Sequence, residues 1–295
     1  MNRDTRQQAI LLYDRFTHDG MERRDFMAAM VKLAGSAAAA ELLVAGIAAS
    51  PAAAAIVPEN DPRLTINRIG LGGWDGVPQY TVYSARPREA AHRPAIIVIH
   101  ENRGLNRHIE DITRRLALAG YAALAPDLLS PQGGTPDNED KAREMIAKVD
   151  LGLATQHVSR MLTLLKQPND AALGSGKAGA VGFCWGGGFV DRLAVAAGDR
   201  LDAGVSYYGP APDPSEAAKV RAPLMLHLAG LDDRVAATAK PFAAALQKAG
   251  KTVEVFEYPG VNHAFNNDTA ADRYNKAAAD LAWDRTLRFF KRHLA

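Results

Sequence analysis

The segment VGFCWGGG, residues 181–188, places the only cysteine of the 295-residue chain among four glycines. An apolar run precedes the segment and a helical pattern follows it, which predicts a sharp turn between a buried strand and a helix. A nucleophile in such a turn has strained backbone angles, and glycines at positions 182 and 186 avoid collisions with its neighbours. The pattern therefore predicts that Cys184 is a nucleophile; a buried structural cysteine is the alternative.

Short apolar runs alternate with longer helical patterns from residue 57 onward, which is typical of βαβ units around a parallel sheet. We predict strands over residues 79–84, 95–100, 121–125, 178–183, 203–208, 224–229 and 252–258. Besides the helix that opens at Cys184, we predict helices over residues 108–119, 140–166, 238–249 and 270–293. The pattern indicates an α/β domain over residues 57–295, with a mostly parallel, twisted sheet and helices on both faces.

A nucleophile in this architecture needs an acid and a histidine, which follow it in that order along the chain. The loop after residues 224–229 offers Asp232, and the loop after residues 252–258 offers His263. Because both loops follow parallel strands, both side chains can reach Cys184 at one edge of the sheet. Asp233 is the alternative acid, although we expect it to cap the following helix. A loop histidine without a catalytic role is the alternative for His263.

Polar residues follow the predicted strand 95–100 in the segment HENRG, residues 100–104. The backbone N–H groups of Asn102 and Trp185 are the candidate donors to a developing oxyanion. Glu101 can hold the thiol proton in the resting protein, because a nearby carboxylate disfavours the thiolate. A salt bridge between Glu101 and Arg103 is the alternative.

Together these residues resemble the dienelactone hydrolase family of α/β-hydrolases. The resemblance covers about residues 79–293 and rests on the segments HENRG, APDL, GFCWGGG, AGLDDRV and YPGVNHAF. It implies the α/β-hydrolase fold and a triad of Cys184, His263 and Asp232, with Glu101 holding the cysteine proton until substrate arrives. HENRGLN, YPGVNHAF and the first residues of the chain are similar to the exported-type subgroup of that family.

The substrate site departs from the family pattern. The type members bind a substrate carboxylate with two arginines, and Pro131 and Asn267 stand at those places here. This departure argues against dienelactone itself as the substrate, and Arg103 is a candidate replacement. Ordinary core packing is the alternative for the aromatic residues that we consider as pocket walls. These candidates are Trp185, Tyr207, Tyr208 and Phe265.

Residues 1–56 differ in composition from the rest, because alanine dominates positions 34–55. Arg23 and Arg24, the aromatic Phe26 and small residues around positions 52–55 resemble a twin-arginine export signal, which predicts a periplasmic or secreted protein. The alternative is a cytoplasmic protein with an uncleaved extension, whose first helix covers residues 5–16. Met21 is a second candidate for the true start. No segment reaches the roughly 18 uncharged apolar residues that a permanent membrane span needs.

The composition narrows the possible partners. The 35 basic and 33 acidic residues are scattered along the chain and give a net charge of +2, which disfavours a nucleic-acid partner. One cysteine makes no internal disulfide, and no Cys/His cluster has metal-ligand spacing, so we expect neither a metal nor a cofactor. The oligomeric state has no sequence signal.

We predict hydrolysis of a small carboxylic ester or lactone by acyl transfer to Cys184. One alternative is a broad-specificity carboxylesterase that acts on larger or polymeric esters. An alternative from a different class is a thiol redox sensor on a hydrolase scaffold.

Overall fold

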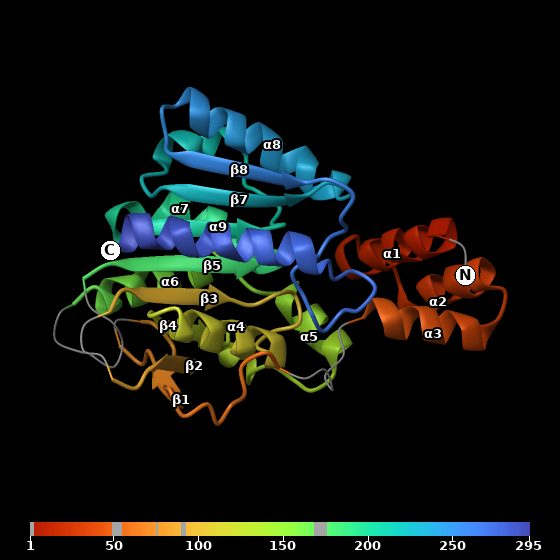
Figure 1. Cartoon of the computed structure of the whole chain (residues 1–295), viewed down its shortest axis with the longest axis horizontal. Coiled ribbons are helices and arrows are strands. Elements are labelled where there is room, and N and C mark those ends of the chain that lie inside the picture. The colour runs from red at the N-terminus through yellow and green to blue at the C-terminus, as the bar shows by residue number, and fades with distance from the viewer. Residues whose placement is uncertain (1–2, 49–54, 75, 90–92, 168–175) are drawn as a thin grey trace.

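The computed structural model describes residues 3–48, 55–74, 76–89, 93–167 and 176–295. Within these residues, the centre of the molecule is an eight-stranded sheet in the order β1-β2-β4-β3-β5-β6-β7-β8 (Figure 1). β2 pairs antiparallel with both β1 and β4, whereas the neighbours from β4 to β8 all pair in parallel. The mostly parallel sheet that the sequence predicted is therefore confirmed.

The strands are β1 Leu64–Leu71, β2 Tyr80–Pro87, β3 Ala95–Ile99, β4 Ala122–Pro126, β5 Ala178–Phe183, β6 Ala203–Tyr207, β7 Leu224–Ala229 and β8 Val253–Tyr258. The sequence patterns predicted each of these strands except β1. That strand lies at the edge of the sheet and pairs only with β2. Most of its side chains are at least partly exposed, so it lacks the continuous apolar run that marks the buried strands.

Helices cover both faces of the sheet (Figure 1). α4 (Arg107–Leu118) and α9 (Lys276–Leu294) pack on one face, where they meet Ile96 and Val98 of β3. α6 (Leu151–Leu165), α7 (Trp185–Ala197) and α8 (Asp233–Lys248) pack on the other face, where Ile97 and Ile99 point. Because alternate residues of a strand face opposite sides, a continuous apolar strand is buried on both faces.

Side-chain caps place three helix ends differently from the predictions. The predicted helix 140–166 is two helices, α5 (Glu139–Ile146) and α6, because Asp150 accepts a hydrogen bond from the Leu153 N–H at 2.9 Å and starts a new helix. The predicted helix 270–293 begins only at residue 276, since Asn275 accepts from the Ala278 N–H at 3.0 Å. The predicted helix 238–249 begins earlier, at residue 233.

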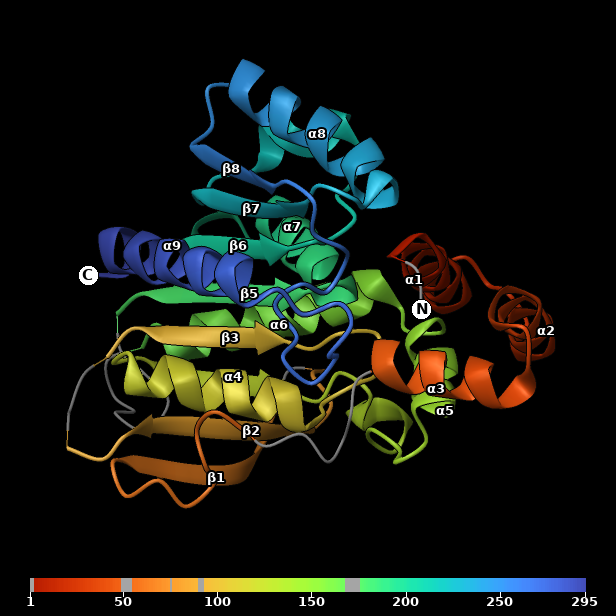
Figure 2. The same ribbon diagram turned by 45° about the vertical axis from the view of Figure 1, so that its right-hand side comes forward.

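Residues 3–48 form three helices, α1 (Arg3–His18), α2 (Arg23–Ala34) and α3 (Ala37–Ile47), which we call the N-terminal unit. The predicted helix 5–16 lies within α1. The unit has an apolar core of its own and lies beyond the carboxyl ends of the parallel strands (Figures 1 and 2). Among the described residues, no single helix is long and apolar enough to cross a bilayer; α2 and α3 reach that length only as a pair bent by 108°. Positions 52–54 of the predicted cleavage region lie outside the described residues.

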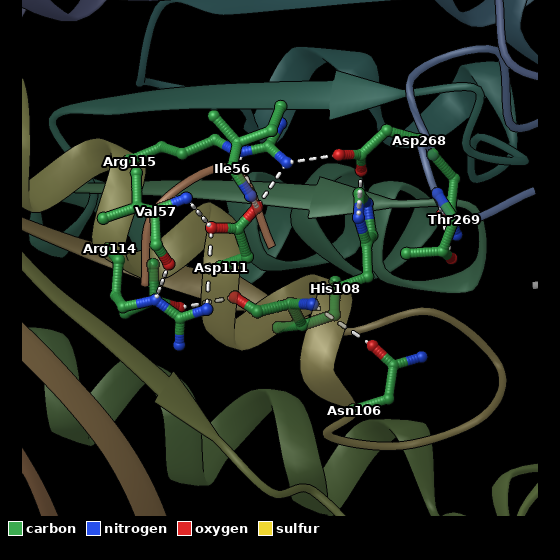
Figure 3. Close-up of polar contacts among 12 residues, drawn as sticks. Ile56, Val57, Asn106, His108, Asp111, Arg114, Arg115, Asp268 and Thr269 are labelled. Carbon is green, nitrogen blue, oxygen red and sulfur yellow. Dashed lines mark hydrogen bonds and ion pairs between the residues drawn. The ribbon is translucent and has the colours of Figure 1, made fainter. Parts of the chain in front are cut away.

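A buried polar network on α4 fixes two distant segments of the chain (Figure 3). The Asp111 carboxylate accepts hydrogen bonds from the backbone N–H groups of Ile56 and Val57, at 3.1 and 2.8 Å. Arg115 and His108 both bind Asp268, at 2.8 and 3.0 Å. The network therefore holds the start of the sheet domain and the long loop after β8, which carries His263, against the same helix.

Candidate active site

Cys184 lies at the turn between β5 and α7 and has φ 56° and ψ −119°, in a region that residues with side chains rarely adopt. A Cβ atom at position 182 would lie 2.0 Å from the Gly186 carbonyl oxygen. A Cβ atom at position 186 would lie 2.4 Å from the His100 carbonyl oxygen. Only glycine fits at both positions, which is the steric reason that the sequence pattern implied.

Asp232 and His263 are brought together from the loops after β7 and β8. The Nδ1 atom of His263 lies 2.6 Å from Oδ2 of Asp232, and both side chains are buried. The other oxygen of Asp232 accepts from the Val235 N–H at 3.2 Å and caps α8. The expectation that Asp233 caps this helix is therefore wrong, because Asp232 performs both tasks while Asp233 is exposed.

The charges around His263 favour its protonated form. Burial by itself lowers the pKa of His263, but the negative charges of Cys184 and Asp232 outweigh burial and raise that pKa to about 10. Burial likewise raises the pKa of Asp232, and the charge of His263 outweighs it and leaves that pKa below its ordinary value. A ring nitrogen of His263 lies within 4.8 Å of the Cys184 sulfur. The arrangement can hold an imidazolium between a carboxylate and a sulfur.

The loop after β3 contributes Glu101 and Arg103 to the site. Glu101 is buried, and its Oε2 atom accepts a hydrogen bond from Asn267 Nδ2 at 2.9 Å. Arg103 pairs with Glu139 at 3.0 Å, and no ion pair joins Glu101 to Arg103 among the described residues. The predicted salt bridge between Glu101 and Arg103 is therefore absent. Instead, the side-chain amide of Asn267, which stands where the family pattern has an arginine, binds the Glu101 carboxylate.

The two candidate oxyanion donors follow neighbouring strands, β5 and β3. Trp185 is the first residue of α7, and its ring stacks on His100 with centroids 5.6 Å apart. Asn102 follows β3, and its side-chain amide donates to the Thr17 carbonyl of α1 at 3.1 Å. Their backbone N–H groups belong to a helix N-terminus and a strand end beside Cys184, where partial positive charge favours an anion.

The three aromatic candidates occupy different surroundings. Tyr208 has φ 40°, is fully buried, and packs edge-on against His263 with ring centroids 4.9 Å apart. Tyr207 points away from the site, because its hydroxyl bonds Thr286 of α9 at 2.7 Å. Phe265 is fully buried, with its ring 4.9 Å from that of Tyr258. Tyr207 and Phe265 therefore belong to the core rather than to the pocket wall.

Two site residues, His18 and Arg273, have no counterpart among the sequence predictions. His18 is the last residue of α1, and its Nε2 atom lies 3.9 Å from the Cys184 sulfur. Its ring centroid lies 4.8 Å from that of His263. Arg273 lies in the loop after β8, six residues beyond Asn267, which stands where the family pattern has an arginine. No local signal distinguishes His18, since nothing in the first helix indicates that it reaches the sheet edge.

A small cavity, which we call the α1 cavity, lies at the sulfur and has a volume of about 10 Å³. Its lining is made by Tyr13, Thr17 and His18 of α1 together with residues of the sheet domain, among them Glu101, Arg103, Cys184, His263 and Arg273. Burial and then the charge of His263 lower the pKa of His18 well below its ordinary value, so this imidazole is neutral. Two histidines with opposite protonation therefore face one sulfur.

The sulfur and the two imidazoles are ligand types that zinc binds, but their arrangement fits the ion poorly. The three ligand atoms lie up to 4.8 Å apart, whereas tetrahedral zinc ligands lie about 3.5 Å apart. Arg103 and Arg273 line the same cavity and repel a cation. We therefore assign no metal to these residues.

Comparisons with known proteins agree on the family. The sequence profile described as the dienelactone hydrolase family matches residues 80–294. A protein of Saccharolobus solfataricus, assigned as a carboxymethylenebutenolidase, is 34% identical over 67% of this chain and 89% of its own. A protein of Escherichia coli O157:H7 with the same assignment is 32% identical over 83% of this chain and 94% of its own.

Solved structures have the same fold. The crystal structure of a Klebsiella pneumoniae protein assigned as a dienelactone hydrolase superposes with a TM-score of 0.66, at 28% identity, over 78% of this chain and 99% of that chain. Brefeldin A esterase superposes with a TM-score of 0.63 at 13% identity, over 91% of this chain and 86% of that chain, and so shares the fold alone. The predicted α/β-hydrolase fold is therefore confirmed.

Proposed function

Because the chain belongs to the dienelactone hydrolase family of hydrolases, we propose that it cleaves a small carboxylic ester or lactone through a thioester on Cys184. The observation that carries the proposal is the 2.6 Å contact between Asp232 and His263 beside a cysteine held at φ 56°. A strained nucleophile, a histidine and an orienting carboxylate are the three parts that acyl transfer requires.

In the acylation step, the Cys184 thiol passes its proton to His263, the resulting thiolate attacks the ester carbonyl carbon, and a C–S bond forms. The negative charge moves to the carbonyl oxygen, where the backbone N–H groups of Asn102 and Trp185 stabilise it. The tetrahedral intermediate then collapses, the bond to the alcohol oxygen breaks, and His263 donates its proton to that oxygen. Its raised pKa keeps the imidazolium available for this transfer at neutral pH.

In the deacylation step, neutral His263 takes a proton from water as the water oxygen attacks the thioester. The C–S bond breaks, the carboxylic acid leaves, and the thiolate and imidazolium are restored. Asp232 stays ionised throughout and keeps the His263 ring oriented with Nδ1 toward it. No step of this cycle requires a cofactor.

The carboxylate of Glu101 has one role in this scheme. Before substrate binds, it accepts a hydrogen bond from the Cys184 thiol, and its negative charge disfavours the thiolate. Asn267 donates to Glu101 at 2.9 Å and keeps the carboxylate in the site while leaving its other oxygen available. Asn267 is therefore a positioning residue that acts through Glu101.

The charge of the cavity lining supports a substrate that carries an anionic or strongly polar group. Arg103 and Arg273 both line the α1 cavity, and both are largely buried. Arg103 already pairs with Glu139 and contacts the Tyr13 hydroxyl, so a substrate anion would exchange with these partners. Tyr208 packs behind His263 and closes the site on its inner side.

An acyl-enzyme experiment tests this function. The protein is mixed with p-nitrophenyl acetate, quenched in acid during turnover, digested and examined by mass spectrometry. We expect an added acetyl mass on the peptide that contains Cys184, and a loss of turnover of at least about 10³-fold in Cys184→Ala. Hydrolysis by Cys184→Ala at the wild-type rate would refute the assignment.

The same assay separates the alternatives. A thiol redox sensor should show sulfenic acid on Cys184 after peroxide and no acyl adduct with any ester. A panel of short aryl esters, lactones and polyester oligomers distinguishes a small-substrate hydrolase from a broad carboxylesterase.

A further inference from the structure

The first helix of the chain lies directly over the proposed nucleophile. In both views α1 approaches the carboxyl ends of the central strands, while α2 lies farther from the sheet (Figures 1 and 2). The Nε2 atom of His18 lies 3.9 Å from the Cys184 sulfur. Tyr13 and Thr17 of the same helix also line the α1 cavity.

This cavity leaves no room for a substrate. Its volume of about 10 Å³ has room for little more than one water molecule. An acetyl group is several times larger than water, so no ester reaches Cys184 while α1 is in this position. Catalysis therefore requires the N-terminal unit to move away from the sulfur or α1 to shift within it.

The contacts between the N-terminal unit and the sheet domain permit such a movement, since they are mostly polar. Gln7 and Asn262 exchange two amide hydrogen bonds, at 2.7 and 3.2 Å. The Arg273 side chain donates to the Ile47 carbonyl at 2.9 Å. Arg23 of α2 forms an ion pair with Asp140 of α5.

The apolar side chains of the unit pack instead against one another. Phe16 and Phe26 stack with ring centroids 4.3 Å apart, and Met30 is fully buried in the same cluster. Separation of the unit from the domain would expose chiefly polar groups, which water can satisfy, and would leave this apolar core closed. Interfaces of this polar kind are typical of domains that move relative to each other.

We propose that α1 is part of the active site, where it covers Cys184 and where His18 determines which acyl groups reach the sulfur. The inference rests on the proposed function of Cys184 as the nucleophile. His18 acts by its position: its ring lies above the sulfur, so a larger acyl group requires a larger shift of α1. The N-terminal unit must then remain attached in the working enzyme, since cleavage around positions 52–55 would remove His18.

A reversible cross-link tests the covering role. Arg23→Cys and Asp140→Cys are combined, and the two new thiols are joined by a short bis-methanethiosulfonate reagent, which reduction releases. Neither position lines the α1 cavity, and the Arg23 side chain is 68% exposed. Each single variant treated with the same reagent is the matched control.

Two readouts are taken from the cross-linked protein. The first is the rate of iodoacetamide alkylation at Cys184, followed on its peptide by mass spectrometry. The second is hydrolysis of p-nitrophenyl acetate. We expect both rates to fall at least about tenfold on cross-linking and to recover on reduction, while the single variants remain at the wild-type rates.

The two readouts separate failure of this inference from failure of the proposed function. Alkylation at the wild-type rate in the fully cross-linked protein would overturn the covering role. If alkylation is suppressed and recovers but no form hydrolyses any ester, the covering role holds and the proposed function fails.

Substitutions at position 18 test the selective role. We expect His18→Ala to raise the ratio of kcat/KM for p-nitrophenyl hexanoate over the acetate by about tenfold, because it opens space above the sulfur. His18→Phe retains the ring shape and should keep the wild-type ratio. Asp19→Ala, at an exposed neighbouring position, is the control.

A ratio of two substrates does not change if part of the sample is unfolded, so it isolates selectivity from stability. An unchanged ratio in His18→Ala would refute the selective role of His18. A ratio that rises equally in His18→Phe would show that the ring nitrogen, and not the shape, matters, and would overturn the steric form of the inference.

Discussion

The N-terminal unit and the sheet domain each have an apolar core, but the surface between them is mainly polar. In the domain, continuous strands such as β3 are buried on both faces by helices. In the unit, three helices bury their apolar residues against one another. This difference indicates that the two regions are separately stable and that their contact can open, which is what a cover over an active site requires.

The two regions also each contribute one histidine to the surroundings of the sulfur, and the pKa values of these two histidines shift in opposite directions. His263 belongs to the domain, has Asp232 behind it, and has a raised pKa. His18 belongs to the unit, and burial and the charge of His263 lower its pKa. One imidazole is therefore protonated at neutral pH, while the other remains neutral.

The largest expected effect comes from the acid behind His263. We expect Asp232→Asn to lower kcat by about 10²–10⁴-fold, because the ring loses the carboxylate that orients it and stabilises its charge. The amide oxygen of the variant can still cap α8, so the fold should persist by circular dichroism. The control is Asp233→Asn, at the exposed neighbouring position, with near wild-type activity. The reverse order of effects would assign the acid role to Asp233.

Core substitutions compare the stability of the two regions. Phe289→Ala in α9 should lower the free energy of unfolding of the domain by about 3–5 kcal/mol, since it leaves a cavity in a fully buried cluster. Met30→Ala should destabilise the N-terminal unit by about 2–5 kcal/mol and leave the domain transition unchanged. Hydrogen exchange followed by mass spectrometry measures both. Faster exchange throughout residues 57–295 in Met30→Ala would contradict separate stability.

The protonation of His263 predicts a dependence of stability on pH. The pKa of His263 is raised from 6.5 to about 10 in the folded protein, so the folded state binds this proton more tightly than the unfolded chain. Its stabilising contribution is complete below pH 6.5 and is lost as the pH rises through about 10. Urea denaturation of the wild type should show falling stability over this range. The same slope in His263→Gln would show that another group causes it.

The smallest expected effect on folding concerns the paired arginines. Arg23→Lys with Arg24→Lys should change the free energy of unfolding by less than about 0.5 kcal/mol, because both side chains are largely exposed. Export through a twin-arginine signal remains a prediction, and this variant should block it if the signal operates. Fractionation of the native host and N-terminal sequencing measure the result. A mature protein that begins after position 55 would contradict the retained cover.

Local sequence patterns were sufficient to predict those helices and strands whose formation depends on residues close together in the chain. Apolar runs predicted the buried strands. The edge strand β1 was not predicted, because most of its side chains are partly exposed and it has no apolar run. The break between α5 and α6 was also missed, since Asp150 caps a new helix within a stretch that has helical periodicity throughout. Periodicity reports burial, whereas a cap depends on one side-chain hydrogen bond.

The sequence by itself determined the parallel sheet, the glycines that the Cys184 turn needs, and the candidate acid and histidine, because strand order and loop position bring such residues to one edge of the sheet. Only the tertiary structure decided that Asn267 holds Glu101, that Tyr207 belongs to the core, and that His18 lies over the sulfur. Those contacts join residues more than 75 positions apart, whose approach depends on packing and leaves no local periodicity.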